Sequence, residues 1–334
     1  MQKNKSKPAL LSPSGYAKDA VKKIDLARIR VAIVATTFRN DDALSKELVL
    51  SLCRAGDRGV AVSVYADTYT YTEPKEFVLK SPRRHPTRAY NAIKVERLLK
   101  KHGVQFHWLG RTSNIGFAGR THSKWLIADT TVYSFGGVNV DGESFTNNDF
   151  MLRINDANLS GELFLQHRRM YKADRSGHAT KCHSIHFSDK SRVLVDGGML
   201  GDSIIYRRAC ALAKQATNIT LVSQYCPTGR LNRILKKKKA TLYFNHWKKA
   251  AWMNKIMIQF GMALTRQHTL YTGNSYLHAK FIIFTMPDKT KIAITGSHNF
   301  MFGSVALGTR EIALETSDAQ IITQLEQFLN DRVK

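Results

Sequence analysis

Apolar and polar positions along the chain follow two periods, and they predict two similar series of helices and strands. Apolar residues at helical spacing predict helices in the first series at residues 16–27, 41–55 and 89–102, and in the second at 202–215, 231–239 and 247–266. Short β-rich apolar runs predict strands at residues 30–38, 58–67 and 104–109, and again at 218–225, 241–245 and 269–271. Alternating helices and strands are typical of an α/β fold.

A short motif is repeated near the end of each series. His122 and Lys124 precede the apolar run Trp-Leu-Ile-Ala, and His278 and Lys280 precede Phe-Ile-Ile-Phe. Each run is followed by a glycine motif, Gly-Gly-Val-Asn in the first copy and Gly-Ser-His-Asn in the second, and then by an acidic residue that leads a further apolar run. Two copies with the same order of parts indicate a duplicated unit.

The duplication predicts how the chain is folded. Two α/β units bury their apolar surface most simply as two mixed sheets packed together about a pseudo-twofold axis, with the helices outside. We expect a basic disordered tail at residues 1–14, a first half at 15–155, a connecting segment at 156–200 and a second half at 201–334. The connecting segment is expected to contain a helix at residues 159–171 and a β-rich patch at residues 192–196. This arrangement would bring both His-x-Lys pairs to one place.

The charge of the chain limits the class of partner that the protein is expected to bind. The 334 residues include 51 Lys and Arg against 26 Asp and Glu, a formal net charge of +25, and such an excess predicts a polyanionic partner, either nucleic acid or an anionic membrane surface. No apolar run reaches the roughly 18 residues of a membrane-spanning helix, and the lysine-rich start lacks the apolar core of a signal peptide. We therefore expect a cytoplasmic protein that binds peripherally to the inner face of the membrane.

The repeated residues also predict a reaction. On an extended segment residues i and i+2 project to the same side, so each histidine lies beside the lysine two residues later, and such a pair suits a phosphate group. Substitution at a phosphodiester needs a nucleophile, an acid for the leaving oxygen and positive charge for the other oxygens. Two histidines and two lysines supply all three, and no metal or other cofactor is required.

Further residues complete the predicted site. Asp149 and Glu311, which lead the later apolar runs, are each expected to accept a hydrogen bond from an imidazole, and the sequence leaves open which acid serves which ring. Residues of the two glycine motifs are expected to bind the phosphate, namely Gly137, Asn139, Ser297 and Asn299.

The pattern H-x-K-x4-D-x6-G-G-x-N resembles the signature of the phospholipase D superfamily, and it is formed here by His122, Lys124, Asp129, Gly136, Gly137 and Asn139. Asp67 and the segment at residues 224–227 are similar to bacterial cardiolipin synthases and related phosphatidyltransferases. The resemblance implies that His122 is the nucleophile, that His278 is the general acid and that Asp129 supports the structure. Thr285 stands where the second copy of the family pattern has its aspartate.

Three functions stay open on the sequence. The leading one is a phosphatidyltransferase of phospholipid synthesis, similar to the cardiolipin synthases, that passes a phosphatidyl group through a phosphohistidine to an alcohol. The alternative is a phosphodiesterase, either a phospholipase D or a nuclease, that passes the group to water. The third is a catalytically silent relative that binds lipid or nucleic acid.

Three basic or apolar segments bear on the substrate. A helix that includes residues 247–260 carries Trp252, Met253, Ile256, Met257 and Phe260 on one face, which either lies in a bilayer interface or packs on the second sheet. The four-lysine run at residues 236–239 meets anionic headgroups, a nucleic-acid backbone or solvent. The basic loop at residues 68–87 either lines the mouth of the site or is simply solvated.

Overall fold

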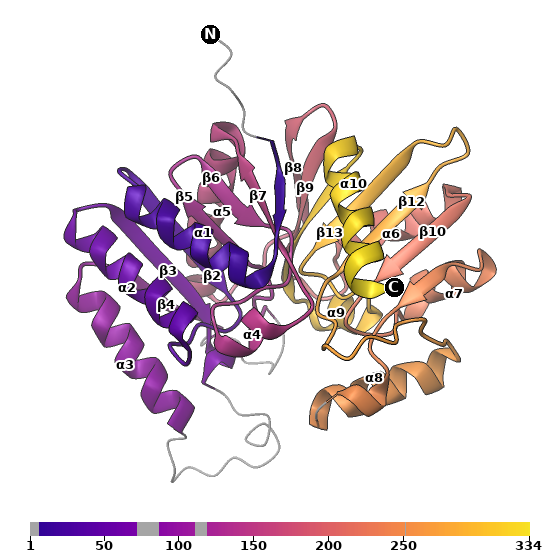
Figure 1. Cartoon of the computed structure of the whole chain (residues 1–334), viewed down its shortest axis with the longest axis horizontal. Helices are drawn as coiled ribbons and strands as arrows, with labels where there is room; N and C mark the ends of the chain where they lie inside the picture. Colours follow the sequence, from indigo (N-terminus) through magenta and orange to yellow (C-terminus); the bar gives the residue numbers. More distant parts are fainter. Residues whose placement is uncertain (1–6, 72–86, 111–118, 251) are drawn as a thin grey trace.

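Two seven-stranded sheets stand side by side in the computed structural model, one from each half of the chain (Figure 1). The structure describes residues 7–71, 87–110, 119–250 and 252–334. The first sheet contains β1 (Ala9–Leu11), β2 (Arg30–Ala35), β3 (Ala61–Asp67), β4 (Gln105–Leu109), β5 (Trp125–Ala128), β6 (Thr131–Ser134) and β7 (Met151–Asn155). The second contains β8 (His183–Ser188), β9 (Ser191–Gly197), β10 (Asn218–Val222), β11 (Thr241–Tyr243), β12 (Phe281–Thr285), β13 (Lys291–Gly296) and β14 (Arg310–Thr316).

The two sheets repeat one plan. β2 lies between parallel β3 and antiparallel β5, and β10 lies between parallel β11 and antiparallel β12. Each sheet then continues through three antiparallel neighbours, β6, β7 and β1 in the first and β13, β14 and β9 in the second. Among the described strands, the edge strands β4 and β8 lack a counterpart. The predicted α/β fold of two repeats with mixed sheets is therefore confirmed.

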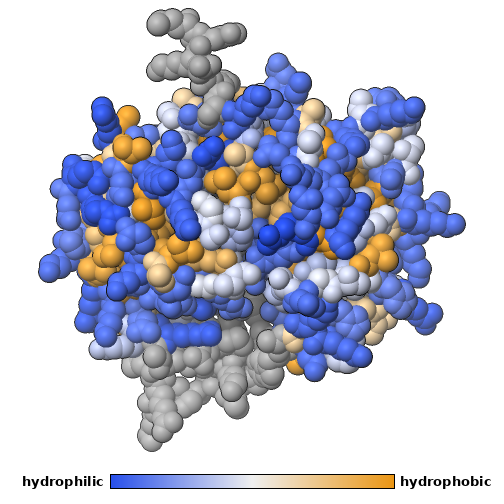
Figure 2. Space-filling model, viewed as in Figure 1, coloured by the Kyte–Doolittle hydropathy of each residue, from blue (hydrophilic) through white to orange (hydrophobic). Residues whose placement is uncertain are grey.

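Helices pack against both sheets. The first half contains α1 (Pro13–Leu26), α2 (Ala43–Asp57), α3 (Thr87–Lys101), α4 (Gly142–Thr146) and α5 (Ala157–Ser176), with a single turn, η1 (Thr68–Thr70). The second contains η3 (Trp247–Lys249), α6 (Ile204–Gln215), α7 (Gly229–Lys237), α8 (Trp252–Thr265), α9 (Phe302–Leu307), α10 (Ala319–Phe328) and η4 (Leu329–Val333). Figure 2 shows that hydrophilic residues cover most of the viewed face of the molecule.

The apolar residues form three cores. One core joins α1, α2 and α3 to the first sheet, and another joins α6 and α7 to the second. The third includes residues of both sheets together with α5 and α10, among them the contacting rings of Phe150, Phe281 and Phe328. Because this third core draws on both halves, burial of its apolar surface holds the two repeats together.

Two segment boundaries differ from the prediction. A disordered tail through residue 14 is wrong for residues 9–11, which form β1, pair with β7 and are fixed by a 2.7 Å hydrogen bond from the Leu10 N–H to the Gln324 side chain. In the connecting segment, the predicted helix at residues 159–171 is confirmed but is longer, as α5, and the predicted β-rich patch at residues 192–196 forms β9, which pairs along its length with β14. The strand β8, which pairs with β9, was not predicted. Strands stabilised by distant partners are poorly specified by their own residues.

The helix predicted at residues 247–266 is divided into two parts. η3 is followed by Ala250, whose extended backbone (φ −101°, ψ 148°) ends that turn before α8 begins. The predicted strand at residues 269–271 is not formed. Most of the predicted basic loop, residues 72–86, and the side chains of Trp252 and Met253 lie outside the described part of the chain.

Asp129 has the supporting role that the resemblance implies. Its carboxylate accepts the backbone N–H groups of Arg28, Ile29 and Arg30 at 2.9 to 3.0 Å, so it ties the turn after β5 to the start of β2. Thr285, at the matching position in β12, makes a corresponding link through its carbonyl, which accepts the N–H of Thr217 at 2.8 Å and its hydroxyl at 3.0 Å. The Thr285 carbonyl therefore accepts hydrogen bonds that link two strands, as the carboxylate of an aspartate at this position would.

Asp129→Ala is expected to lower the free energy of unfolding by about 1 to 3 kcal/mol, because three backbone donors lose their acceptor. Asp129 also has a left-handed φ of 50°, which asparagine tolerates better than alanine. Asp129→Asn keeps that tolerance and one acceptor oxygen, so its loss should be smaller. Denaturant unfolding of the two variants and the wild type measures the difference, and an alanine variant as stable as the wild type would contradict the role.

Candidate active site

Each His-x-Lys motif is bonded through its backbone to the half of the molecule to which it does not belong. Isolated β-bridges join Thr121 to Arg310 and Leu277 to Asn148, so the residue before each histidine pairs with the residue before the acid of the other half. The His122 N–H donates to the Arg310 carbonyl at 2.8 Å, and the His278 N–H donates to the Asn148 carbonyl at 2.9 Å. Backbone contacts across the boundary between the halves therefore position both histidines.

Each histidine is oriented by the carboxylate of the opposite half. His122 Nδ1 lies 3.0 Å from Glu311 Oε2, and His278 Nδ1 lies 2.6 Å from Asp149 Oδ2. Both carboxylates are buried. The sequence predicts two such pairs without assigning them, and the structure assigns them crosswise. With Nδ1 bound to a carboxylate, Nε2 is the ring nitrogen left to react in each case.

The two lysines are buried beside the histidines. Lys124 Nζ donates to Thr36 Oγ1 at 2.9 Å and to the His122 carbonyl at 2.7 Å, and Lys280 Nζ donates to the His278 carbonyl at 2.5 Å. Burial, together with the nearby charge of Lys280, lowers the pKa of Lys124 to about 7, and burial lowers the pKa of Lys280 to about 8. Two positive charges held this close favour an anion between them.

Thr36 is a site residue that the sequence analysis missed. It directly follows β2, and its hydroxyl fixes the Lys124 ammonium. Its backbone N–H and that of Thr37 donate to Asn139 Oδ1 at 3.1 and 3.3 Å. The available signal is its place, because polar residues at the carboxyl ends of parallel strands commonly build the site of an α/β protein.

The rings are neutral and the carboxylates ionised in the free site at neutral pH. Burial lowers the pKa of His122, and burial with the charge of Lys280 lowers the pKa of His278 to about 4. Burial opposes ionisation of the acids, but the interaction with His122 outweighs it and lowers the pKa of Glu311 to about 2; the hydrogen bond from His278 likewise lowers the pKa of Asp149. Both Nε2 atoms therefore carry a free electron pair.

Comparison with known proteins agrees with the motifs. Residues 20–171 match the sequence family described as "Cardiolipin synthase, PLD-like domain", and the second half repeats the fold and the motif of the first. The first half of the chain is therefore similar to the phospholipase D-like proteins. No curated protein matches its sequence.

Solved structures share the fold of this chain over nearly its whole length. Phosphatidylserine synthase from Haemophilus influenzae Rd KW20 is 12% identical with a TM-score of 0.71, and the match covers 98% of this chain and 87% of that one. Polyphosphate kinase from Porphyromonas gingivalis is 11% identical with a TM-score of 0.62, and the match covers 97% of this chain and 50% of that one. At these identities the likeness shows the fold.

The repeated glycine motif fits its acid differently in the two halves. A Cβ atom on Gly137 would lie 2.8 Å from His278 Nδ1 and would also collide with Asp149 Oδ2. Ser297, at the matching position, is buried and its hydroxyl donates to Glu311. Glycine therefore leaves room for the Asp149–His278 pair, whereas the side chain of Ser297 contributes to the Glu311–His122 pair.

Gly137→Ala is expected to lower turnover by about 100-fold or more, because the added methyl group must displace the Asp149 carboxylate or the His278 ring. Gly161→Ala is the matched control: a Cβ atom there, within α5, meets no atom within 4 Å, so turnover should be unchanged. Steady-state rates on one phosphodiester substrate measure both variants. Wild-type turnover in Gly137→Ala would mean that the close approach is not needed.

Two of the predicted phosphate contacts are corrected. Ser297 is wrong as a direct phosphate ligand, because its hydroxyl proton is given to Glu311. Gly137 is also wrong in that role, because its N–H donates to Asp149 Oδ1 at 3.2 Å. Asn139 and Asn299 are both nearly buried, and the carbonyl oxygen of Asn139 is bonded to backbone as described, which leaves its amide N–H groups for the predicted contact. Donation by these two asparagines stays a prediction.

The segments that lead into the two histidines are fixed by different side chains. Asp67 is buried and accepts from Arg120 Nη1 at 2.6 Å and from the Thr121 N–H at 2.9 Å. On the other side, Gln224 Nε2 donates at 3.0 Å to the hydroxyls of Tyr225 and Tyr276. Asp67 and the segment at 224–227, which carry part of the sequence resemblance, thus lie at the approach to the site.

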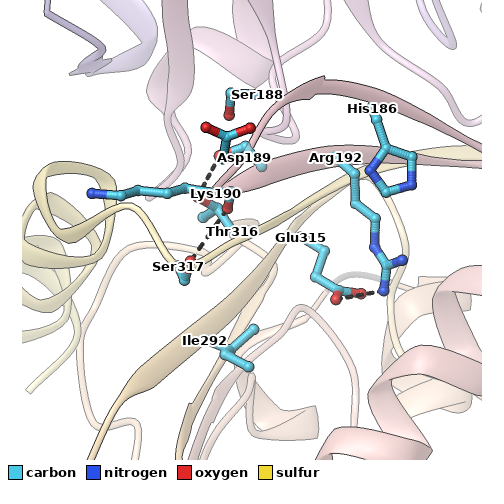
Figure 3. Close-up of a pocket in the computed structure, with 10 residues that line it drawn as sticks. His186, Ser188, Asp189, Lys190, Arg192, Ile292, Glu315, Thr316 and Ser317 are labelled. Carbon is cyan, nitrogen blue, oxygen red and sulfur yellow. Dashed lines mark hydrogen bonds and ion pairs between the residues drawn. The ribbon is translucent and has the colours of Figure 1, made fainter.

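A separate hollow lies away from the histidines. It has a volume of about 230 Å³ at the β8–β9 turn, and it is lined by His186, Ser188, Asp189, Lys190, Ser191, Arg192, Ile292, Glu315, Thr316 and Ser317. Figure 3 shows Arg192 facing Glu315, whose carboxylate accepts from Arg192 and Arg208 at 2.8 Å. Since this carboxylate is already paired with two arginines, we assign no reaction to the hollow.

The described residues contain no group of three or more His, Cys, Asp or Glu arranged to hold a metal ion. Across the described ranges, every helix is too short or too polar to cross a bilayer.

Proposed function

We propose that the protein is a phosphatidyltransferase of phospholipid synthesis that works through a phosphohistidine. The observation that carries the proposal is the crosswise pairing of His122 with Glu311 and of His278 with Asp149. Two neutral imidazoles with free Nε2 atoms, beside two buried ammonium groups, supply the nucleophile, the proton carrier and the positive charge that double displacement at a phosphodiester requires.

In the first step, His122 Nε2 attacks phosphorus while His278 Nε2–H gives its proton to the leaving oxygen. The bond from phosphorus to nitrogen forms as the bond to the leaving oxygen breaks. The His122 ring becomes cationic, and the Glu311 carboxylate at its Nδ1–H stabilises that charge. Lys124 and Lys280 neutralise the non-bridging oxygens, so no metal ion is required.

In the second step, the neutral His278 Nε2 takes the proton of an alcohol as the alcohol oxygen attacks phosphorus. The bond from phosphorus to His122 breaks, and His122 returns to its neutral form. Asp149 holds the proton on His278 Nδ1 throughout, so that Nε2 is the atom that accepts and donates.

Binding of substrate favours uptake from solvent of the proton that the first step needs. Below the pKa of about 7 of Lys124, both lysines are charged, both carboxylates are ionised and both rings are neutral, so the charges of these six groups sum to zero. A phosphodiester brings one negative charge, which favours uptake of one proton by an imidazole. One proton on His278 leaves His122 neutral, which is the state that the first step needs.

The lipid substrate is supported by similarity and charge. The matching family is described as cardiolipin synthase, the solved structure with the same fold along 98% of the chain is a phosphatidylserine synthase, and the net charge of +25 suits an anionic membrane surface. We therefore propose a peripheral membrane enzyme with a phospholipid or nucleotide-activated lipid as the donor.

Incubation with defined lipids tests the proposal. Phosphatidylglycerol or a nucleotide-activated diacylglycerol phosphate serves as the donor, and serine, glycerol or a second phosphatidylglycerol serves as the acceptor. Mass spectrometry should detect a new phosphodiester that contains the acceptor. Formation of phosphatidic acid alone, whatever the acceptor, would support transfer to water instead. Cleavage of single-stranded DNA without lipid turnover would replace the lipid substrate with nucleic acid.

Above about pH 6.5, where His122 is neutral because its pKa is lowered from that value, kcat/KM is expected to fall as the pH rises, and to fall more steeply above about 7 to 8. The free His278 ring must gain a proton to act as the acid, and its pKa is lowered to about 4; the lysines lose their charge through pKa values of about 7 and about 8. The pH profile of kcat/KM reports groups of the free enzyme. A level profile across the pKa range of both lysines would contradict this assignment.

A further inference from the structure

The outer face of α8 is apolar and exposed. Four of its large apolar side chains are more than two-fifths exposed: Ile256 (60%), Met257 (42%), Phe260 (67%) and Leu264 (65%). They follow one another at intervals of one, three and four residues, which places them on one side of the helix. The expectation that Ile256, Met257 and Phe260 pack on the second sheet is therefore wrong, since Ile258 is instead the buried residue of this stretch. Exposed apolar faces of this kind mark contact surfaces.

Positive charge surrounds this face. From residue 203 to residue 287 the sequence contains fourteen Lys and Arg and no Asp or Glu. Lys248 and Lys255 lie with their Nζ atoms 5.7 and 5.4 Å from the Trp247 ring at the amino end of α8. α7, which carries the exposed lysines 236 and 237, accepts through Asn232 a 3.0 Å hydrogen bond from Gln267, two residues after the end of α8.

α8 is also connected to the active site. Tyr225 donates to Asn254 Oδ1 of α8 at 2.6 Å, and Gln224 links Tyr225 to Tyr276, two residues before His278. Figure 1 shows α8 at the same end of the molecule as α3 and α4, and α4 follows the first glycine motif. A surface bound by α8 would therefore contact a helix that is linked by hydrogen bonds to the segment before His278.

We propose that α8 is a membrane-docking helix whose apolar face, formed by Ile256, Met257, Phe260 and Leu264, enters the interface of an anionic bilayer. Aliphatic side chains gain free energy by leaving water for acyl chains, while the surrounding lysines attract anionic headgroups. A nucleic acid would use the lysines but would leave three aliphatic side chains in water. The role of this docking in catalysis rests on the proposed lipid substrate, whereas the docking itself is tested without turnover.

Co-sedimentation with vesicles tests the proposal. The test variant carries Ile256→Gln, Phe260→Gln and Leu264→Gln. The matched control carries Leu26→Gln and Ile29→Gln, two side chains that are each 71% exposed in the first half. Wild type and control should bind vesicles of phosphatidylcholine with phosphatidylglycerol, and the test variant should bind on the order of tenfold less or weaker still. Omission of phosphatidylglycerol or a rise in salt should weaken wild-type binding.

Further measurements separate the possible failures. Thermal unfolding and turnover of a short-chain, water-soluble phosphodiester show whether the test variant is folded with an intact site. Equal vesicle binding by test variant and wild type would overturn the proposal, as would a wild type that ignores anionic vesicles. A wild-type dimer that becomes a monomer in the test variant would mean that a second copy covers α8. If the wild type binds vesicles but turns over no phosphodiester, the proposed function would be contradicted and the docking proposal would stand.

Discussion

His122→Ala is expected to lower turnover by about 10⁴-fold or more and to leave no phosphoenzyme, because the alanine variant lacks the Nε2 that forms the bond to phosphorus. His278→Ala should lower turnover of an alkyl phosphodiester by about 10² to 10⁴-fold, the range of general acid catalysis. These two substitutions separate the proposed roles of the rings.

A substrate with a nitrophenolate leaving group makes the separation sharp. Such a group departs without a proton, so His278→Ala should recover its first step on this substrate and accumulate an acid-labile, base-stable phosphoenzyme, because the second step lacks its base. His122→Ala should not recover. Rapid quench with a labelled phosphodiester measures the phosphoenzyme. The opposite result, a phosphoenzyme in His122→Ala and none in His278→Ala, would exchange the two roles.

Glu311→Gln and Asp149→Asn are expected to lower turnover by about 10² to 10⁴-fold each, because an amide preserves the shape of the carboxylate but does not stabilise an imidazolium. Because the two acids bond to different histidines, each substitution should slow a different chemical event. Glu311→Gln should slow formation of the phosphohistidine on every substrate, since Glu311 bonds to His122. Asp149→Asn should slow departure of the alkoxide, since Asp149 bonds to His278, and a nitrophenolate leaving group should relieve it.

Glu315→Gln is the matched control for these variants. Glu315 lies on β14 with Glu311, and it accepts from Arg192 and Arg208, away from the histidines. Its substitution should lower stability and leave turnover near that of the wild type. If the nitrophenolate substrate restored the rate of Glu311→Gln and not that of Asp149→Asn, Glu311 would be the acid that supports the proton donor and Asp149 the acid that supports the nucleophile, contrary to the prediction.

Local residues were enough to predict many elements. The helix predicted at residues 41–55 forms as α2 because the Asp42 carboxylate accepts the N–H groups of Leu44 and Ser45 in its first turn. A segment whose stability depends on a distant partner was not predicted. β1 exists through pairing with β7, which is far away in the sequence.

The candidate site also contains residues that the sequence predicted and residues whose roles only the structure shows. The residue types that react, His122, Lys124, His278 and Lys280, follow from the repeated motif. Thr36 was missed, and Ser297 and Gly137 were given the wrong task, because their roles depend on which atoms lie next to them. Small differences in atomic position decide whether a residue of a glycine motif contacts a phosphate or a neighbouring carboxylate. The spacing of residues along the chain does not specify such differences.

The sequence by itself determined that this protein contains two copies of one α/β unit with a histidine and a lysine in each, because periodicity and repeated residue types are properties of the chain alone. Only the tertiary structure decided that each histidine is held by the acid of the other half and that the apolar face of α8 is exposed to solvent. Both facts arise where segments more than 100 residues apart come together, or fail to, and burial and hydrogen bonding between such segments are settled only when the whole chain is folded.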